Sequence, residues 1–217
     1  NYSPPIDAAL NRIGRDIIEL EQYMDFLRNR LFRQTLLCHR GIPLNRALGP
    51  WSLRDFRIAA SLRPVGADQS LAADQAATFR GPRDLTISSS QPIVKAALAC
   101  LAESWPEPIL FSELFAQARE QLHHQGVALA ADGMESEFGA ALLTCYTKGL
   151  CELHVHAGAF AVVAGDRPCA CPLARWQAVR GTAVTNRRHE RLFLDSLGQH
   201  LLPLLDGEHD RDALLDA

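Results

Sequence analysis

The stretch that decides the fold runs from residue 92 to residue 162 and opens with PIVKAALACLAESWPEPILFSELFAQAREQL (92–122). Its apolar residues recur at spacings of three and four, which is typical of amphipathic helices. Proline is favoured at the first position of a helix, so Pro92 marks the start of the first one. Trp105-Pro106-Glu107-Pro108 ends it, and Ser112 is expected to cap the second. The predicted buried faces consist of Ile93, Val94, Ala97, Leu98 and Leu101, and then of Leu114, Phe115, Ala118 and Leu122.

A third helix and a β-hairpin follow. Asp132 and Glu135 form a capping-box pattern, and Gly149 suits the position after the helix end. The predicted inner face of this helix consists of Phe138, Ala141, Leu142, Cys145 and Tyr146. After it, Cys151, Leu153 and Val155 alternate with polar residues, 157–159 form a turn, and Phe160 and Val162 return. Three helices followed by a two-stranded wing indicate a winged helix.

The residues before 91 fall into two parts. A helix over 7–33 is predicted, with one apolar stripe at spacings of three and four. Residues 34–90 alternate short apolar pieces with turn formers, which is typical of short strands and irregular loops. Ser88-Ser89-Ser90 reads as a linker. The predicted fold is therefore α+β, with one domain over 1–89 and a winged-helix domain over 90–217 that ends in a helical extension from 166. The stripe consists of Leu10, Ile13, Ile17, Leu20, Met24, Leu27 and Leu31.

The stripe has two interpretations. It could form a coiled-coil seam with another subunit or domain, which would make a homodimer, or it could pack on the chain's own core. In a parallel seam Asp16 and Glu21 would face each other as like charges, and Gly14 weakens a continuous helix. We favour packing within the chain and leave an antiparallel or interdomain contact open.

Composition excludes several classes. The 217 residues are 47% hydrophobic and 22% charged, which excludes wholesale disorder. No apolar stretch approaches the roughly 18 residues of a membrane span, and no secretory signal is visible. The chain begins with Asn1, and we expect it to be a piece of a longer polypeptide. Six cysteines at this length are not a disulfide framework, so a reduced, cytoplasmic setting is expected.

Glycine spacing excludes the common phosphate cradles. No two of the 14 glycines are separated by a single residue, and none begins a G-x-x-x-x-G-K-[ST] loop. A G-x-S-x-G elbow is also absent. We therefore expect no catalytic residue and no cofactor site for a dinucleotide, AdoMet or ATP in this chain.

Charge is unevenly distributed. Residues 1–91 hold 12 arginines, no lysine and 9 acids, a net charge of +3, whereas 92–217 hold 10 basic residues and 16 acids, a net charge of −6. Arg28, Arg30 and Arg33 lie in the densest basic stretch, and they are the predicted contact face for an anionic partner. The alternative is that these arginines are solvated or paired with acids elsewhere in the chain.

The sequence offers two further candidate sites. The third helix could enter a DNA groove, but it offers Lys148 against Glu135 and Glu137, which is the wrong sign for phosphate contacts. Cys169-x-Cys171 with His154, His156 or His189 could bind zinc, but structural zinc prefers two to four residues between cysteines. We therefore predict no metal site and treat a nucleic-acid-binding winged helix as the alternative function.

The chain resembles a known family over nearly its whole length. Residues 21–38, EQYMDFLRNRLFRQTLLC, are similar to the signature of the methyltransferase regulatory domain found in bacterial AdoMet-dependent methyltransferases. Later stretches resemble the winged-helix C-terminal domain of bacterial protein lysine methyltransferases. These are Pro92-Ile93, Trp105-Pro106, Tyr146 with Gly149-Leu150, Asp166-Arg167-Pro168, Pro172 to Arg175, Thr185-Asn186 with His189, and Leu204 to Gly207.

The resemblance implies an accessory role. It implies an AdoMet-binding methyltransferase domain earlier in the same polypeptide, with this chain as a non-catalytic module that positions or gates that domain or its protein substrate. It carries no catalytic residue onto this chain. The expected partners are the methyltransferase domain and a protein substrate, with neither membrane nor nucleic acid.

Overall fold

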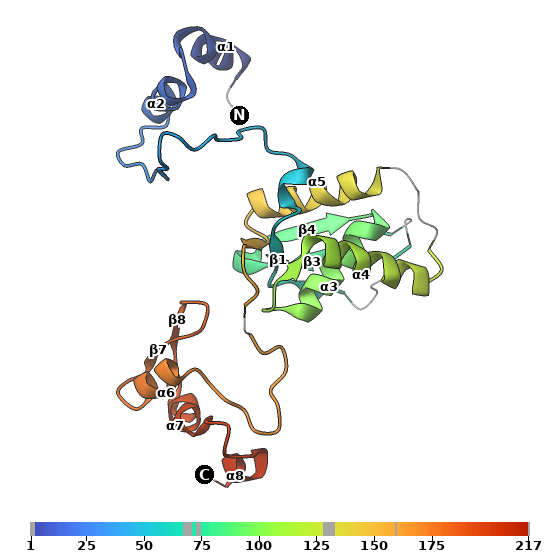
Figure 1. Cartoon of the computed structure of the whole chain (residues 1–217), viewed down its shortest axis with the longest axis vertical. Helices are drawn as coiled ribbons and strands as arrows, with labels where there is room; N and C mark the ends of the chain where they lie inside the picture. Colours follow the sequence, from blue (N-terminus) through green and yellow to red (C-terminus); the bar gives the residue numbers. More distant parts are fainter. Residues whose placement is uncertain (1–2, 67–70, 73–74, 128–132, 159, 217) are drawn as a thin grey trace. The chain divides into compact units, whose positions relative to one another are not determined.

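The chain consists of two units, residues 1–46 and 47–217, in a computed structural model (Figure 1). The structure describes residues 3–66, 71–72, 75–127, 133–158 and 160–216. We call these the N-terminal unit and the C-terminal unit and describe each by itself. The predicted division at residues 89 and 90 stays a prediction, but one hydrophobic cluster of the C-terminal unit contains residues from both sides of it, including Phe79 and Leu98.

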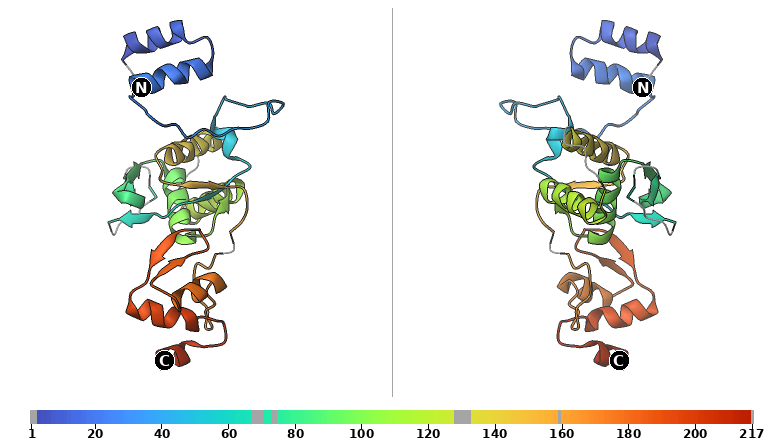
Figure 2. Two further views of the ribbon diagram at one scale, coloured as in Figure 1. Left: turned by 90° about the vertical axis from the view of Figure 1, so that its left-hand side faces the viewer. Right: turned by 90° about the vertical axis from the view of Figure 1, so that its right-hand side faces the viewer.

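The N-terminal unit is a pair of helices, α1 (Pro4–Ile13) and α2 (Ile17–Leu27), which lie side by side (Figure 2). The predicted single helix over 7–33 is therefore wrong. Gly14 adopts an extended backbone, and the Asp16 carboxylate accepts hydrogen bonds from the backbone N–H groups of Ile18 (2.8 Å) and Glu19 (2.9 Å). Such a cap satisfies amide groups that a continuous helix would have paired. The apolar spacing continues across this break, so periodicity alone does not detect it.

The C-terminal unit contains two three-stranded antiparallel sheets. One sheet has β1 at its centre, and the other has the order β2-β3-β4. The first sheet consists of β5 (Ile109–Leu110), β1 (Arg57–Ala59) and β6 (Glu152–His154). The second consists of β2 (Arg63–Val65), β3 (Ala77–Arg80) and β4 (Thr86–Ser89), and short 3-10 helices η1 (Pro50–Leu53) and η2 (Pro82–Asp84) precede β1 and β4.

One prediction for residues 34–90 needs correction. The predicted linker at Ser88-Ser89-Ser90 is wrong, because Ser88 and Ser89 pair with β3 in β4 and the Ser88 hydroxyl lies 2.7 Å from that of Thr78. Short strands form near Ile58 and Pro64 as expected. By contrast, residues 28–49, all of which the structure describes, contain no helix or strand.

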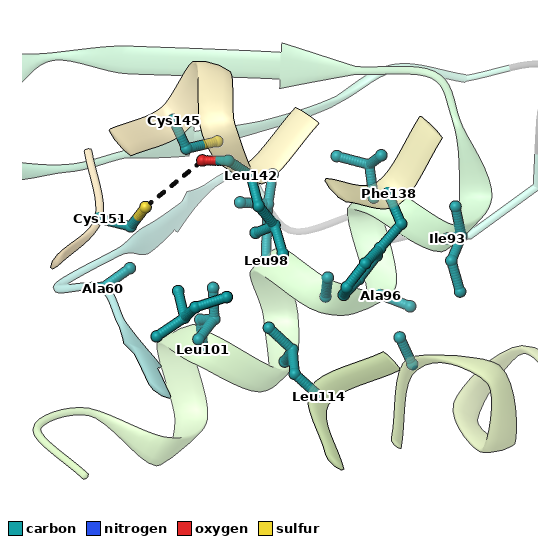
Figure 3. Packing of buried hydrophobic residues seen from close by; sticks show 14 of the residues in the cluster. Ala60, Ile93, Ala96, Leu98, Leu101, Leu114, Phe138, Leu142, Cys145 and Cys151 are labelled. Carbon is teal, nitrogen blue, oxygen red and sulfur yellow. Dashed lines mark hydrogen bonds between the residues drawn. The ribbon is translucent and has the colours of Figure 1, made fainter. Parts of the chain in front are cut away.

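Three helices predicted from the sequence cover the sheets: α3 (Pro92–Ser104), α4 (Phe111–His124) and α5 (Met134–Thr147). Most of their predicted apolar faces form the core, where Phe138 and Leu142 of α5 lie opposite Leu98 and Leu101 of α3 (Figure 3). Tyr146, which was predicted on the inner face of α5, is instead exposed. Helix α4 begins one residue before the expected cap Ser112. Asp132, the expected cap of α5, lies outside the described residues, and Gly133 with a positive φ of 82° occupies the cap position.

The predicted hairpin over 151–162 is wrong. Its first half is β6, but β6 pairs with β1, with Leu153 opposite Ile58, and no strand occurs in the described residues 160–165. Ile58 and Ala59 are fully buried, so β1 needs a strand on each side to satisfy its backbone. The segment read as a free wing is thus an edge strand of the core sheet.

The predicted helical extension from 166 also contains strands. Three residues, Ala174, Ala178 and Val184, form a small separate cluster with Leu194 and Leu202 packed against it. The predicted break at Pro203 lies inside the last turn of α7, and the break at Asp206-Gly207 is confirmed as a turn. The elements are α6 (Pro172–Ala178), β7 (Ala183–Thr185), β8 (Arg191–Phe193), α7 (Ser196–Leu204) and α8 (Arg211–Leu215).

Candidate interaction surfaces

The three predicted partner-facing arginines follow the end of α2. Arg33 returns to α2, where it donates to the Glu21 carboxylate (2.9 Å) and the Glu21 carbonyl (2.7 Å) and pairs with Asp25 at 2.5 Å. Arg30 lies 3.6 Å from the same aspartate. Arg28 follows the last residue of α2, and its side chain is exposed. Two of the three arginines therefore use part of their charge within the N-terminal unit, and their contact with a partner stays a prediction.

Apolar side chains neighbour these arginines in the sequence and are exposed. Leu10 is the only buried residue among residues 3–46. Phe26 is 81% exposed and Phe32 is 90% exposed, and Leu31, Leu36 and Leu37 are exposed to a similar degree. Large apolar patches on a soluble protein mark surfaces that bind something. We call Phe26, Leu31, Phe32, Leu36 and Leu37 the apolar stretch of the N-terminal unit.

Arg188 joins the C-terminal segment to the core sheet within the C-terminal unit, and the sequence did not single it out. Its Nη2 donates to both carboxylate oxygens of Glu152 in β6, at 2.7 and 2.8 Å. Its guanidinium also lies 4.2 Å from the ring centre of Trp105. Burial alone would lower the pKa of Arg188, but the hydrogen bonds and charges of Glu152 and Glu190 together outweigh burial and raise that pKa. These contacts fix residues 186–190 on the sheet.

The residues considered for a zinc site occupy different local environments. Cys169 forms a β-bridge with Asp206, and Cys171 precedes α6. His154 Nε2 lies 3.1 Å from the Glu152 carboxylate, while His189 occupies a turn with a positive φ of 61°. Within the described ranges, no three His, Cys, Asp or Glu side chains gather closely enough to hold a metal ion.

The cysteines differ in reactivity according to burial. All six are free thiols. Burial raises the pKa of Cys145 from 9.0 to about 11 and that of Cys151 from 9.0 to about 12. The Cys151 thiol donates to the Leu142 carbonyl at 3.7 Å (Figure 3). A protonated, buried thiol is a poor nucleophile, so neither cysteine suits covalent catalysis.

Lys95 is a buried cation with a structural explanation. It is fully buried at the base of α3, and its Nζ donates to the carbonyl oxygens of Ala72 and Gln75, the latter at 2.8 Å. The contacts tie Ala72 and Gln75 to α3. A buried charge needs such partners, and here main-chain oxygens supply them.

The face of α5 does not suit nucleic acid. Glu135 and Glu137 occupy its first turn, and Glu135 pairs with Arg54 at 2.9 Å. Because β6 is part of the core sheet, it does not project as a wing.

Among the helices that the structure describes, none has the length and apolar character to cross a membrane.

Two family models match the two ends of the chain. The model described as a predicted methyltransferase regulatory domain matches residues 1–39, and the model described as the C-terminal winged helix domain of PKMT matches residues 166–217. Both were expected from the sequence. The winged-helix match covers the last part of the predicted 90–217 domain, and the three-helix core precedes it.

The chain is also similar to a protein of known structure. PKMT2 from Rickettsia typhi has a TM-score of 0.79 and 27% identity, and the match covers 100% of this chain and 44% of PKMT2. PKMT2 in complex with AdoHcy gives a TM-score of 0.78 at the same identity. The chain is similar to PKMT2 over its whole length.

Two relatives from a second species also match this chain. Uncharacterized protein RP789 of Rickettsia prowazekii (strain Madrid E) is 25% identical over 224 residues, which cover 100% of this chain and 39% of that protein. Uncharacterized protein RP027 of the same strain is 27% identical over 202 residues, which cover 87% of this chain and 79% of that protein. The chain therefore spans about two fifths of PKMT2 and of RP789.

Proposed function

We propose that this chain is a non-catalytic accessory module of an AdoMet-dependent protein lysine methyltransferase. The observation that carries the proposal is the match over the full length of the chain to 44% of PKMT2. The regulatory-domain and winged-helix matches at its two ends support the same assignment. In this proposal AdoMet binds to a methyltransferase domain of the same polypeptide, and the protein acts in the cytoplasm.

The N-terminal unit supplies the contact with the catalytic domain in this proposal. Its apolar stretch is exposed, and a stable contact needs a buried apolar centre with polar groups around it. Arg28, Arg30 and Arg33 lie next to that stretch and would form the polar rim. Regulation requires that this contact favour one state of the catalytic domain, because equal contact with both states shifts nothing.

The test uses the full-length protein. Phe26→Ser and Phe32→Ser remove exposed apolar groups from the proposed contact, and Val163→Ser, at an exposed position in the C-terminal unit, is the matched control. We expect the double variant to change methyl transfer from labelled AdoMet to a lysine-containing peptide library at least threefold, while the control does not.

A direct binding measurement separates this module from an enzyme. Titration of residues 1–217 with AdoMet should give no heat of binding, because the AdoMet site is assigned to another domain. Tight binding to this chain would refute the non-catalytic assignment. Unchanged methyl transfer in the double variant would refute regulation and leave a structural role.

A further inference from the structure

Two arginines and two aromatic rings frame a recess in the C-terminal segment. The Arg180 guanidinium lies 4.0 Å from the ring centre of Trp176, and that of Arg191 lies 5.1 Å from the ring centre of Phe193. All four side chains are exposed and line one recess of about 300 Å³. We call these four residues the aromatic–arginine recess.

Hydrogen bonds between α6 and β7, and between the residues that flank the β7–β8 hairpin, hold the walls of the recess in place. Gln177 Oε1 accepts from the Thr185 backbone N–H at 2.7 Å, and Leu194 N–H donates to the Thr182 carbonyl at 2.8 Å. Arg180 Nη1 donates to the Trp176 carbonyl at 3.0 Å, so this guanidinium is already oriented. A ligand therefore loses less conformational freedom on binding than it would with mobile arginines.

The charge of the recess has no internal counterpart. Neither Arg180 nor Arg191 forms an ion pair with a carboxylate in the described part of the chain. The neighbouring Glu190 accepts from Asn186 at 2.7 Å and pairs with Arg188 at 3.4 Å, so it is directed elsewhere. Guanidinium groups bind carboxylates by two parallel hydrogen bonds, and exposed rings favour apolar contact.

We propose that the aromatic–arginine recess binds an acidic peptide segment that carries an apolar side chain beside its carboxylates. The inference rests on the proposed function, because it assigns the holding of a protein substrate to this site. Stacked rings and arginines also occur in single-strand nucleic-acid sites. Two arginines are few for a phosphate backbone, which needs a longer row of clustered basic side chains, so the peptide is favoured.

Fluorescence anisotropy with the chain of residues 1–217 tests the proposal. The probes are four labelled molecules: an octapeptide of alternating Glu and Leu, the same peptide with Lys for Glu, the same with Ser for Leu, and a ten-nucleotide oligothymidine. We expect the Glu–Leu peptide to bind at least tenfold more tightly than the other three. Trp176 emission should change on binding.

Variants locate the site. Arg180→Gln with Arg191→Gln should weaken binding of the Glu–Leu peptide at least tenfold, whereas Arg63→Gln, at an exposed arginine outside the recess, should leave it within twofold. Equal or tighter binding of the oligothymidine, no peptide binding at 1 mM, or full binding by the double variant would each overturn the proposal. The assay involves no methyl transfer, so its result is independent of the turnover test above.

Discussion

The two units differ in how far they bury their apolar side chains. The C-terminal unit buries a continuous cluster in which Phe138 contacts Phe111 and Phe115, with ring centres 5.2 and 5.0 Å apart. In the described residues of the N-terminal unit only Leu10 is buried, and Phe32 is almost fully exposed. Burial of apolar area is the main stabilising contribution to folding, so the C-terminal unit can fold on its own contacts. The apolar stretch of the N-terminal unit stays exposed, which is why we propose it as a contact surface.

The largest expected difference between the units concerns a buried and an exposed phenylalanine. Phe138→Ala should lower the free energy of unfolding by about 3–5 kcal/mol, because it leaves a cavity among packed rings. Phe32→Ala should change it by less than about 0.5 kcal/mol. Urea denaturation of residues 1–217 measures both. Similar losses for the two variants would mean that the apolar stretch is packed within the chain and would break the comparison.

Two glycines offer a second comparison. A Cβ atom on Gly139 would lie 2.7 Å from the Cβ of Pro50, because α5 packs closely on η1, whereas Gly41 has open space around it. Gly139→Ala should therefore lower the free energy of unfolding by about 1–3 kcal/mol through overpacking. Gly41→Ala should be neutral within about 0.5 kcal/mol. Thermal unfolding checks both, and a stabilised Gly139→Ala protein would contradict the close approach.

Two paired arginines sharpen the comparison further. Arg188→Ala removes the hydrogen bonds to both carboxylate oxygens of Glu152 and the guanidinium contact with the Trp105 ring. It should lower the free energy of unfolding by only about 1–2 kcal/mol, because Glu152 is partly exposed. Arg33→Ala, in the N-terminal unit, should lower it by less than about 1 kcal/mol. Hydrogen exchange of the amides in β6 should rise in the first variant only. Faster exchange there in the Arg33→Ala protein would contradict this assignment.

Cysteine labelling gives the smallest effect and needs no substitution. At pH 8 iodoacetamide should modify the exposed Cys38 and spare Cys145 and Cys151, whose pKa values of about 11 and about 12 keep them protonated. Mass spectrometry after digestion reads the result, and labelling in urea is the control in which all react. Because folding raises these two pKa values, their contribution to stability is complete below pH 9 and declines as the pH rises toward 11 and 12.

Local patterns predicted the helices of the core and missed the contacts that join distant residues. Spacings of three and four located α3, α4 and α5 and most of their buried faces. The pairing of β6 with β1 connects residues about 95 positions apart, and no local pattern encodes it. The break at Gly14 was visible as a weak position, but the decisive contact is the Asp16 cap, which an unbroken apolar spacing obscures.

The candidate surfaces show the same limit. Arg28, Arg30 and Arg33 were found from charge density, but the ion pair between Arg33 and Glu21 requires the helix to end at Leu27 and the chain to turn back. Trp176 and Arg180 are four residues apart, a spacing that could have suggested a stacked pair at a helix end. Their position beside Arg191 and Phe193 depends on the β7–β8 hairpin, in a segment whose local pattern predicts helix.

The central place of β1 in its sheet has a consequence for how this protein can be cut and synthesised. A fragment beginning at residue 90 would keep both outer strands and lack the one between them, leaving two rows of unpaired backbone groups. During translation the sheet cannot close until residue 154 has emerged from the ribosome, although its middle strand is made almost a hundred residues earlier. Expression clones should therefore start upstream of η1.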